Sequence, residues 1–316
     1  IRLQSSNGVG IYFGQNVSPG NPNAVQNQFK NPQLYANPAG YVTFDGGDQR
    51  SFRFMLDVCS ATPTTLPHRS VFYLGLGTSN ITIKNCLIEN YPQSTASYAA
   101  NLPIAKYISP NFSFEDDTRS LTSGLDSYSA GIVSRSKVPS IGGNNALALD
   151  TLSNDNNKFI SNEISGFGYG IVSLGVGPLF YNDIAPNGNP RFQRYYNKGT
   201  VISKNLISNV RRAGVYSGYG ENEQISDNRI INVGIGATGA GGSTAGVMLG
   251  GAARSGQYVY NNIGSKVERN EISHVSSDEA VTGVLVEQTM NNFVAPTGGT
   301  VTFPNTNEMI RVTGNM

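Results

Sequence analysis

Tryptophan is absent from this chain of 316 residues, and cysteine and histidine occur only twice each. Two cysteines are too few for a disulfide-stabilised scaffold, and neither Cys59 nor Cys86 stands at a metal-binding spacing. The histidines, His68 and His274, also lack a partner at such a spacing, and nothing in the sequence indicates a catalytic triad around them. The scarcity of these residues argues against a zinc site and against a cysteine-rich fold.

Charge is equally scarce, since charged residues make up 14% of the chain and the formal net charge is +1. This balance provides no basic surface for nucleic acid and no acidic tail. No apolar run approaches the roughly 18 residues of a membrane-spanning helix, and the first residues lack the pattern of a signal peptide. We expect no nucleic-acid partner and no membrane-spanning segment, and any export signal should lie outside this sequence.

Glycine is abundant, with 37 residues, and asparagine, serine and tyrosine are also frequent. Glycine and asparagine favour tight turns, while amides and hydroxyls take the place of charges on the polar surface. This composition is typical of secreted proteins rich in β-structure.

A short phrase recurs along the chain, in which asparagine is followed after one residue by isoleucine or leucine. Apolar residues come shortly before most of these asparagines, and a further apolar residue follows the last four at a constant distance. Each copy therefore predicts a strand, a bend and a second strand. The asparagines of this phrase are Asn85, Asn162, Asn205, Asn228 and Asn270.

A second phrase consists of glycine followed by isoleucine or valine and by further β-forming residues. Its copies are separated by unequal intervals, which indicates a fixed structural unit with connections of variable length. The glycines of this phrase are Gly10, Gly131, Gly170, Gly214, Gly246 and Gly283.

Short strands separated by glycine and asparagine bends predict a right-handed parallel β-helix that forms one domain over residues 1–316. Stacking each turn of the helix on the next pairs the backbone at about 4.8 Å and buries the apolar positions in one core. Asparagine at the bend tolerates the left-handed conformation, and its side-chain amides can stack in a ladder. Because bare ends would expose strand edges, we expect the chain to be a segment of a longer polypeptide.

Two stretches interrupt the repeated pattern, at residues 91–126 and 177–197, and both are rich in proline. Inserted surface loops on a solenoid commonly carry the binding function. Aromatic rings can stack on sugar faces, so the second stretch predicts a carbohydrate-binding surface. Its candidate residues are Tyr181, Phe192, Tyr195 and Tyr196.

Acidic residues in the first stretch have three interpretations. Glu115, Asp116 and Asp117 are consecutive, and such a run is most often a solvated turn. Asp116 and Asp117 could instead hold calcium through their oxygens, and paired carboxylates are also what glycoside hydrolysis needs. We therefore assign no catalytic residue and no cofactor, with calcium as the one metal that these acids could bind.

Other acids are more simply explained as turn residues. Asp45 and Asp48 flank two glycines and are expected to close a tight turn. Asp150 and Asp155 lie next to a strand among several asparagines, where they form a turn or contact a cation or a sugar hydroxyl.

Arg211 and Arg212 are adjacent, and such a pair could stabilise the negative charge that forms during β-elimination of a uronate. No acid cluster is evident near them in the sequence, so we expect both side chains at the surface. For Cys59 and Cys86, stacking of residues 54–58 under residues 81–85 would bring the two within disulfide range. Two stacked reduced thiols are the alternative.

Several segments resemble the β-helix regions of very large cell-surface and secreted proteins of Bacteroidota. The segments are YVTFDGG, GTSNITIKNCLIENY, NNKFISNEISGFGYGIVS and GTVISKNLISNVRRAGVYSG. The resemblance covers most of the chain and implies an extracellular or bacterial cell-surface location. It also implies export by the type IX route and a role as an adhesin or surface filament.

We therefore expect a non-enzymatic, adhesive or structural segment of a larger surface protein, which contacts glycans or other cell-surface components. The alternative is a polysaccharide lyase or glycoside hydrolase of the pectin-active β-helix type. The Asn-Thr-Asp, Gly-His-Gly and Arg-Ile-Lys signatures of the polygalacturonases are missing, and the calcium acids and arginine of the pectate lyases have no match residue by residue.

The repeated phrase leads to a prediction for Ile207, which stands at an expected core position. Replacement of Ile207 by aspartate should lower the free energy of unfolding by several kcal/mol, because it buries a charge without a partner. Arg212→Ala should be nearly silent if Arg212 is at the surface. Thermal unfolding of the two variants measures both effects, and equal melting temperatures would contradict the assignment.

Overall fold

The computed structural model of the chain describes residues 2–5, 9–13, 40–58, 68–75, 77–90, 128–135, 153–181, 191–234, 244–250, 262–276, 281–286, 292–294, 300–302 and 310–316. Within these ranges every regular element is a β-strand and none is a helix. The predicted all-β class is therefore confirmed for the described part of the chain. This part also contains no helix of the length and hydropathy that a membrane crossing requires.

Most strands belong to three seven-stranded sheets, which we name sheets I, II and III. Sheet I contains β3 (Thr43–Asp45), β6 (Thr82–Lys84), β9 (Lys158–Ile160), β15 (Val201–Ser203), β19 (Gln224–Ser226), β22 (Lys266–Glu268) and β27 (Arg311–Thr313). Sheet II contains β1 (Arg2–Ser5), β4 (Phe52–Val58), β7 (Cys86–Asn90), β10 (Glu163–Ser165), β16 (Leu206–Val210), β20 (Arg229–Val233) and β23 (Glu271–Val275). Sheet III contains β2 (Val9–Phe13), β5 (His68–Gly75), β8 (Tyr128–Arg135), β11 (Tyr169–Leu174), β17 (Ala213–Gly218), β21 (Thr244–Leu249) and β24 (Val281–Val286).

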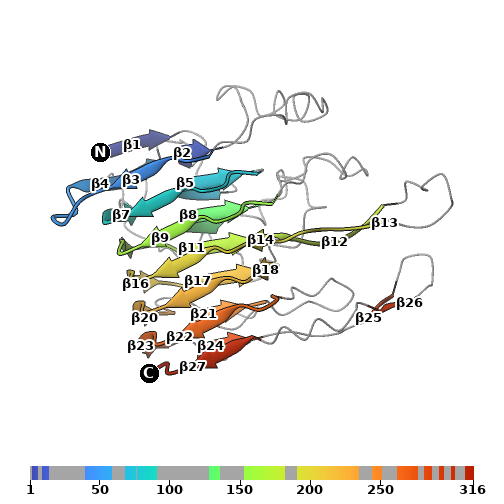
Figure 1. The fold of residues 1–316 in the computed structure, drawn as a ribbon. Coiled ribbons are helices and arrows are strands. Elements are labelled where there is room, and N and C mark those ends of the chain that lie inside the picture. Colours follow the sequence, from blue (N-terminus) through green and yellow to red (C-terminus); the bar gives the residue numbers. More distant parts are fainter. Residues whose placement is uncertain are drawn as a thin grey trace.

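Three smaller sheets have two strands each. They are the antiparallel pair β12 (Val176–Tyr181) and β13 (Arg191–Tyr195), the parallel pair β14 (Asn197–Lys198) and β18 (Gly220–Glu221), and the antiparallel pair β25 (Asn292–Val294) and β26 (Thr300–Thr302). Figure 1 shows both antiparallel hairpins on the same side of the stacked sheets.

The chain visits sheets I, II and III in turn, so that β6, β7 and β8 are followed by β9, β10 and β11 in the same three sheets. We call one such set of three strands a repeat. Every pairing within the three sheets is parallel, and each strand lies beside its counterpart in the next repeat. The predicted parallel stacking is therefore confirmed, and the arrangement is compatible with a parallel β-helix.

The core lies between the three sheets and takes its residues from the repeated phrases. Ile164, Ile207 and Ile230 of the first phrase are fully buried in one continuous apolar cluster. Gly131, Gly170, Gly214 and Gly246 of the second phrase face isoleucines of the first: a Cβ atom on Gly214 would lie 2.5 Å from Cγ2 of Ile230 and 2.8 Å from the carbonyl oxygen of Gly246. At these four positions no side chain fits between the isoleucine and the next repeat, whereas a Cβ atom on Gly283 would have open space.

In four of the bends between sheets I and II, the residue directly before the asparagine of the first phrase has the left-handed conformation. Ser161, Lys204, Asp227 and Arg269 have positive φ angles, whereas the asparagines that follow them do not. The prediction that those asparagines themselves adopt the left-handed conformation is therefore wrong. Their role is in the hydrogen bonds of the side chain.

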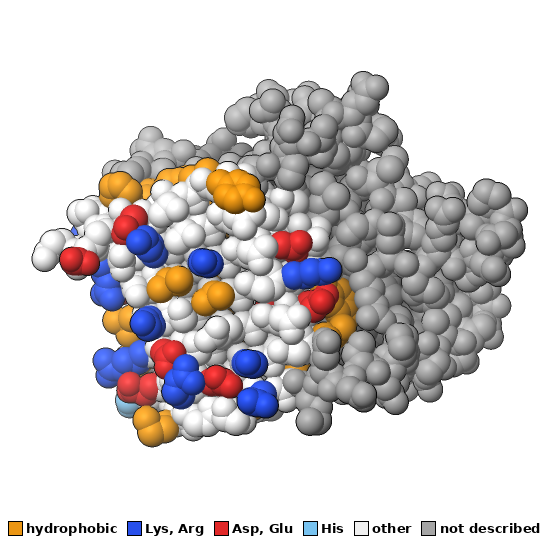
Figure 2. All heavy atoms as spheres, viewed as in Figure 1, with side chains coloured by type: hydrophobic (Ala, Val, Ile, Leu, Met, Phe, Trp, Pro, Cys, Tyr) orange, Lys and Arg blue, Asp and Glu red, His pale blue; other side chains and the backbone are white. Residues whose placement is uncertain are grey.

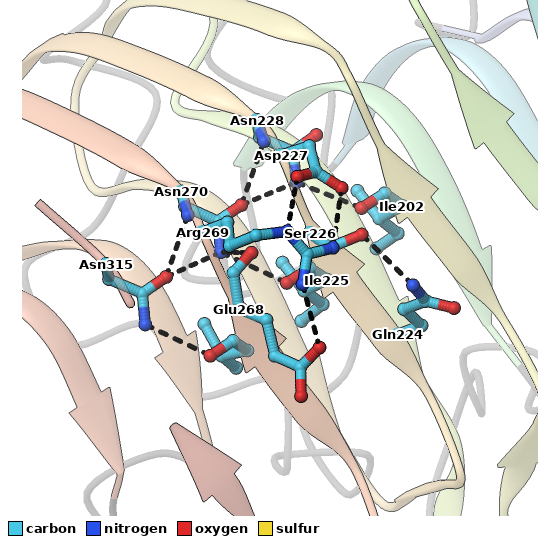
Figure 3. Close-up of polar contacts among 11 residues, drawn as sticks. Ile202, Gln224, Ile225, Ser226, Asp227, Asn228, Glu268, Arg269, Asn270 and Asn315 are labelled. Atoms are coloured by element: carbon cyan, nitrogen blue, oxygen red, sulfur yellow. Dashed lines mark hydrogen bonds and ion pairs between the residues drawn. The ribbon is translucent and has the colours of Figure 1, made fainter. Parts of the chain in front are cut away.

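These side chains form a ladder that runs from repeat to repeat (Figure 3). Asn205 Nδ2 donates a hydrogen bond to Asn228 Oδ1 at 2.9 Å, and Asn228 Nδ2 donates to Asn270 Oδ1 at 2.9 Å. Each of these oxygens also accepts a hydrogen bond from the backbone nitrogen of the preceding asparagine, at 3.0 Å. The ladder extends by one residue at each end. Asn162 Nδ2 donates to Asn205 Oδ1 at 3.2 Å, and Asn270 Nδ2 donates to Asn315 Oδ1 at 2.9 Å.

Asn85 does not belong to the ladder. The register pairs Leu87 with Glu163, so the residue level with Asn162 is Cys86, whose backbone nitrogen donates to Asn162 Oδ1 at 3.0 Å. Asn85 itself has a φ of 54°, and its side chain donates to Asp45 Oδ1 at 2.9 Å. Asn85 is thus the left-handed residue of its bend, where asparagine is favoured for that conformation.

The connections between strands differ according to the sheets that they join. Sheets I and II are linked by tight bends, such as the single residue Asn85 between β6 and β7. The long intervals between consecutive strands of the three sheets all begin or end at a strand of sheet III, and each contains more residues than the bends between sheets I and II. They include residues 14–42, 59–67, 91–127, 136–157, 234–243, 250–265 and 287–310. Variable insertion is therefore concentrated at the two ends of sheet III.

We predict that Asn228→Ala will lower the free energy of unfolding by about 3 kcal/mol, because it leaves buried groups of the ladder without partners. These groups include the carbonyl oxygen of Ile202, which accepts from Asn228 Nδ2 at 2.9 Å. Gln224→Ala, in an exposed position of the neighbouring strand β19, is the control and should change stability little. Chemical denaturation measures both variants, and an equal effect would contradict the structural role of the ladder.

Candidate functional site

Strands β11, β17 and β21 in the middle of sheet III are buried on both faces, whereas its last strand β24 has exposed positions. Every residue of β11, β17 and β21 is buried, whereas β16 and β22 include exposed positions. Because side chains alternate between the faces of a strand, one set fills the core and the other forms a second apolar cluster outside it. This second cluster includes Val133, Val172, Tyr216 and Met248, which are aligned across four strands.

Aromatic rings are prominent in this outer cluster. The rings of Tyr169 and Tyr216 have their centroids 5.9 Å apart, and those of Tyr196 and Tyr219 lie 5.6 Å apart. All four side chains are buried. We therefore take the outer face of sheet III and its margins, where the long intervals of sequence begin or end, as the candidate functional site.

Arg211 and Arg212 lie at the margin of this face, between β16 and β17. The prediction that they are surface residues is wrong, because their side chains are only 5% and 8% exposed. Arg212→Ala consequently removes a buried side chain and will not be silent. Sequence alone did not reveal this because two adjacent arginines usually indicate a solvated position.

The face shown in Figure 2 has basic and acidic side chains interspersed among the described residues. Exposed ion pairs also link charged side chains of neighbouring repeats, such as Arg269 with Asp227 at 2.8 Å and Arg229 with Glu271 at 3.1 Å. Exposed pairs contribute little to stability. The described part of this face therefore offers no extended surface of one charge sign.

A buried glutamate, Glu223, lies between sheets III and I. Its side chain is 1% exposed and accepts hydrogen bonds from the hydroxyl of Ser173, at 2.6 Å, and from that of Ser217. Burial raises the pKa of Glu223 to about 7, although these two hydroxyl contacts lower it. Glu223 was not predicted from the sequence.

Glu223 compensates for an asparagine that is missing from one repeat. Asn197 and Asn262 donate through Nδ2 to the hydroxyls of Ser173 and Ser217, at 3.2 and 3.0 Å. In the repeat between them Gly220 takes the position level with Asn197, and a Cβ atom on Gly220 would collide with the carboxylate of Glu223. Glu223 thus fills the space of a missing asparagine side chain and completes the polar column. The absence of asparagine at position 220 is the only sequence signal.

The predicted carbohydrate-binding residues do not all lie in one environment. Tyr181, Phe192 and Tyr195 belong to the hairpin β12–β13, in which Phe192 pairs with Phe180 and Tyr195 with Val176. Tyr196, by contrast, is only 4% exposed and packs in the outer cluster of sheet III. The ring of Tyr196 therefore has no face open to a sugar.

The other candidate acids are partly outside the described residues. Asp116, Asp117 and Asp150 lie there, so the calcium prediction stays a prediction. Among the residues that are described, no group of three or more His, Cys, Asp or Glu side chains could hold a metal ion. Asp155 is partly buried, its Oδ1 accepts a hydrogen bond from the backbone nitrogen of Lys198 at 3.1 Å, and burial raises its pKa.

The turn at Asp45 is present as predicted. Asp45 Oδ1 accepts a hydrogen bond from the nitrogen of Gly47 at 2.9 Å, and Oδ2 pairs with Lys84 at 2.9 Å. The contacts with Lys84, Asn85 and Gly47 lower the pKa of Asp45 to about 2. Asp45 is therefore a structural turn residue.

The predicted stacking of residues 54–58 under residues 81–85, which would have brought Cys59 and Cys86 within disulfide range, is not observed. Cys86 pairs with Phe52, so residues 54–58 do not lie level with residues 81–85. The thiol of Cys86 is buried and donates a hydrogen bond to the carbonyl oxygen of Lys84 at 3.1 Å, and burial raises its pKa to about 11. Cys59 lies outside the described residues, so the pairing itself stays a prediction.

Comparisons of the chain with protein-family models, with curated proteins and with solved structures gave no match. The functional argument therefore depends on the geometry described above.

Glu223 leads to a prediction about pH. Its pKa is about 7 in the folded chain and has an ordinary value of 4.5, so folding favours the protonated form. Below about pH 4.5 this group makes its full contribution to the free energy of unfolding. The contribution is lost as the pH rises through 7, and the total loss is about 3 kcal/mol. Glu223→Gln should therefore gain stability relative to the wild type between pH 4.5 and pH 8.

Chemical denaturation across this pH range tests the prediction. Glu221→Gln, which removes a partly exposed carboxylate two residues away, is the matched control and should follow the wild type. If Glu223→Gln and the wild type keep a constant difference in unfolding free energy over the whole range, the buried carboxyl does not titrate as described.

Proposed function

We propose that the chain is a right-handed parallel β-helix that serves as a non-enzymatic scaffold within a larger secreted or cell-surface protein. In this proposal the side of sheet III contacts glycans or other surface components, and the remainder of the polypeptide continues the structure. The proposal agrees with the resemblance to β-helix regions of Bacteroidota surface proteins and with export by their type IX route.

One observation supports the scaffold role above others: all long connections and both hairpins occur at sheet III, while sheets I and II are joined by tight bends. A solenoid with loops confined to one side presents them together as a single extended surface. Sheets I and II instead use their outer positions for ion pairs between repeats. Binding is therefore assigned to the side of sheet III.

The polar residues that the structure describes in the interior support a structural role. The asparagine ladder bonds to itself and to backbone groups, and Glu223 is enclosed by two serine hydroxyls. A catalytic acid must instead reach the substrate, directly or through one water. Glu223 is thus explained by the packing of the repeats and has no catalytic assignment.

Incubation of the chain with acidic and neutral polysaccharides distinguishes the proposal from its enzymatic alternative. We expect retention of the chain on at least one polysaccharide without release of unsaturated products or reducing ends. Sustained turnover would overturn the scaffold assignment in favour of a polysaccharide lyase or glycoside hydrolase, and retention on none would overturn the glycan contact.

The hairpin β12–β13 gives a residue-level prediction. Combined replacement of Tyr181, Phe192 and Tyr195 by alanine should weaken glycan binding about tenfold, if each ring supplies a modest part of the stacking energy. The melting temperature should change little. Tyr196→Ala is the contrasting variant, because loss of this buried ring should lower the free energy of unfolding by about 3 kcal/mol.

Affinity electrophoresis in the retained polysaccharide and thermal unfolding measure the two effects separately. Unchanged binding by the triple variant would remove the hairpin from the glycan-contacting surface.

A further inference from the structure

The two buried arginines occupy an insertion in the repeat. The backbone nitrogens of Arg211 and Arg212 donate to the carbonyl oxygens of Phe167 and Gly168, at 3.1 and 2.8 Å. Ala213 then pairs with Tyr169. Arg211 and Arg212 therefore both lie beside Gly168, the one residue that the preceding repeat has at this point. The neighbouring glycine has no side chain, which leaves space for the arginines at the margin of sheet III.

Arg211 is unusual because a buried guanidinium normally has its donors occupied. Its Nη1 atom is buried and makes no hydrogen bond with any residue that the structure describes, and the side chain is 5% exposed. Burial, and secondly the charge of Arg212, lower the pKa of Arg211. A buried cation beside a second cation is unfavourable unless a negative charge compensates for it.

Two further polar groups lie beside the pair. Arg212 makes a side-chain hydrogen bond with Tyr169, which opposes the effect of burial on the pKa of that phenol. In the following repeat the nitrogen of Ala245 donates to the carbonyl oxygen of Arg212 at 3.0 Å, which places Thr244 next to Arg212. The hydroxyl of Thr244 is also buried, and it has no hydrogen-bond partner within the described part of the chain. Two unused donor groups therefore stand on adjacent repeats at the same margin of sheet III.

We propose that Arg211, together with Arg212 and Thr244, forms a binding site for an oxyanion, the carboxylate or sulfate group of an acidic ligand. The planar guanidinium presents paired N–H donors that match the oxygens of such groups, and charge-assisted hydrogen bonds of this kind are strong. The anion would accept hydrogen bonds from Arg211 Nη1 and from the hydroxyl of Thr244. Its negative charge would also offset the repulsion between the two arginines. This site goes beyond the proposed glycan contact at the hairpin and does not depend on it.

Thermal unfolding of the chain in chloride buffer with added sodium sulfate, sodium galacturonate or galactose tests the site. An anion that binds only the folded state raises the melting temperature by an amount that increases with its concentration relative to its dissociation constant. We expect an increment with sulfate, with galacturonate or with both, and none with galactose. Sulfate alone would identify an inorganic oxyanion as the ligand, whereas galacturonate would identify the carboxylate of an acidic saccharide.

Arg211→Met and the control Arg229→Met remove the same charge from a buried and an exposed position. The part of the increment that is due to the site should be lost in Arg211→Met and kept in Arg229→Met. The increment that remains in Arg211→Met measures the general stabilising effect of sulfate. Calorimetric titration with the effective anion should show at least a roughly tenfold loss of affinity in Arg211→Met, since hydrogen bonds to charged groups contribute about 1.5–3 kcal/mol. An equal increment in both variants, no increment in the wild type, or an equal one with galactose would overturn the proposal.

The stability of the variant without added anion provides a second, independent measurement. If Arg211 is an uncompensated buried cation, Arg211→Met in chloride buffer should melt at or above the temperature of the wild type. A melting temperature several degrees lower would show that Arg211 already has a structural partner, and the oxyanion site would be overturned.

Discussion

Each repeat of this chain must satisfy polar groups that the next repeat leaves inside the stack, and the rest of the structure depends on this constraint. The backbone is paired by the parallel sheets, but the bends between sheets I and II leave amide and carbonyl groups that no strand can reach. Asn205 and Asn228 solve this problem, because one side chain accepts from the preceding asparagine and donates to the following one. Because buried polar groups are costly when they lack a partner, the ladder from Asn162 to Asn315 favours one register between the repeats that it joins.

The same requirement explains the exceptions. Where Gly220 removes an asparagine from a second polar column, Glu223 extends into the vacant space and bonds to the serines on either side. The substitute satisfies the hydrogen bonds but introduces an ionisable group into the interior, and its pKa rises to about 7 as a consequence. Tight packing has a similar effect at Gly214, where the approach of Ile230 excludes any side chain. Local irregularities in the sequence thus follow from the demands of neighbouring repeats.

The distribution of connections divides the surface into a constant and a variable part. Sheets I and II are joined by short bends of between one and six residues, and their outer charges pair from repeat to repeat, as Arg269 does with Asp227. Sheet III receives the long connections at both ends, and its outer face is covered with a second apolar cluster. A buried margin of that face also holds Arg211, whose Nη1 atom has no hydrogen-bond partner among the described residues. Function is therefore sought on the one side where the repeat is free to change.

The sequence by itself determined the class of fold, because strand-forming phrases with glycine and asparagine at recurring positions are local signals that any stacked neighbour reinforces. It also identified Asn162, Asn205, Asn228 and Asn270 as structural residues. Only the tertiary structure decided that the left-handed residue precedes each of these asparagines, that Cys86 and not Asn85 is level with Asn162, and that Arg211 and Arg212 are buried. These properties depend on the register between repeats and on what covers a side chain. Both arise from residues distant in the sequence, so no local pattern contains them.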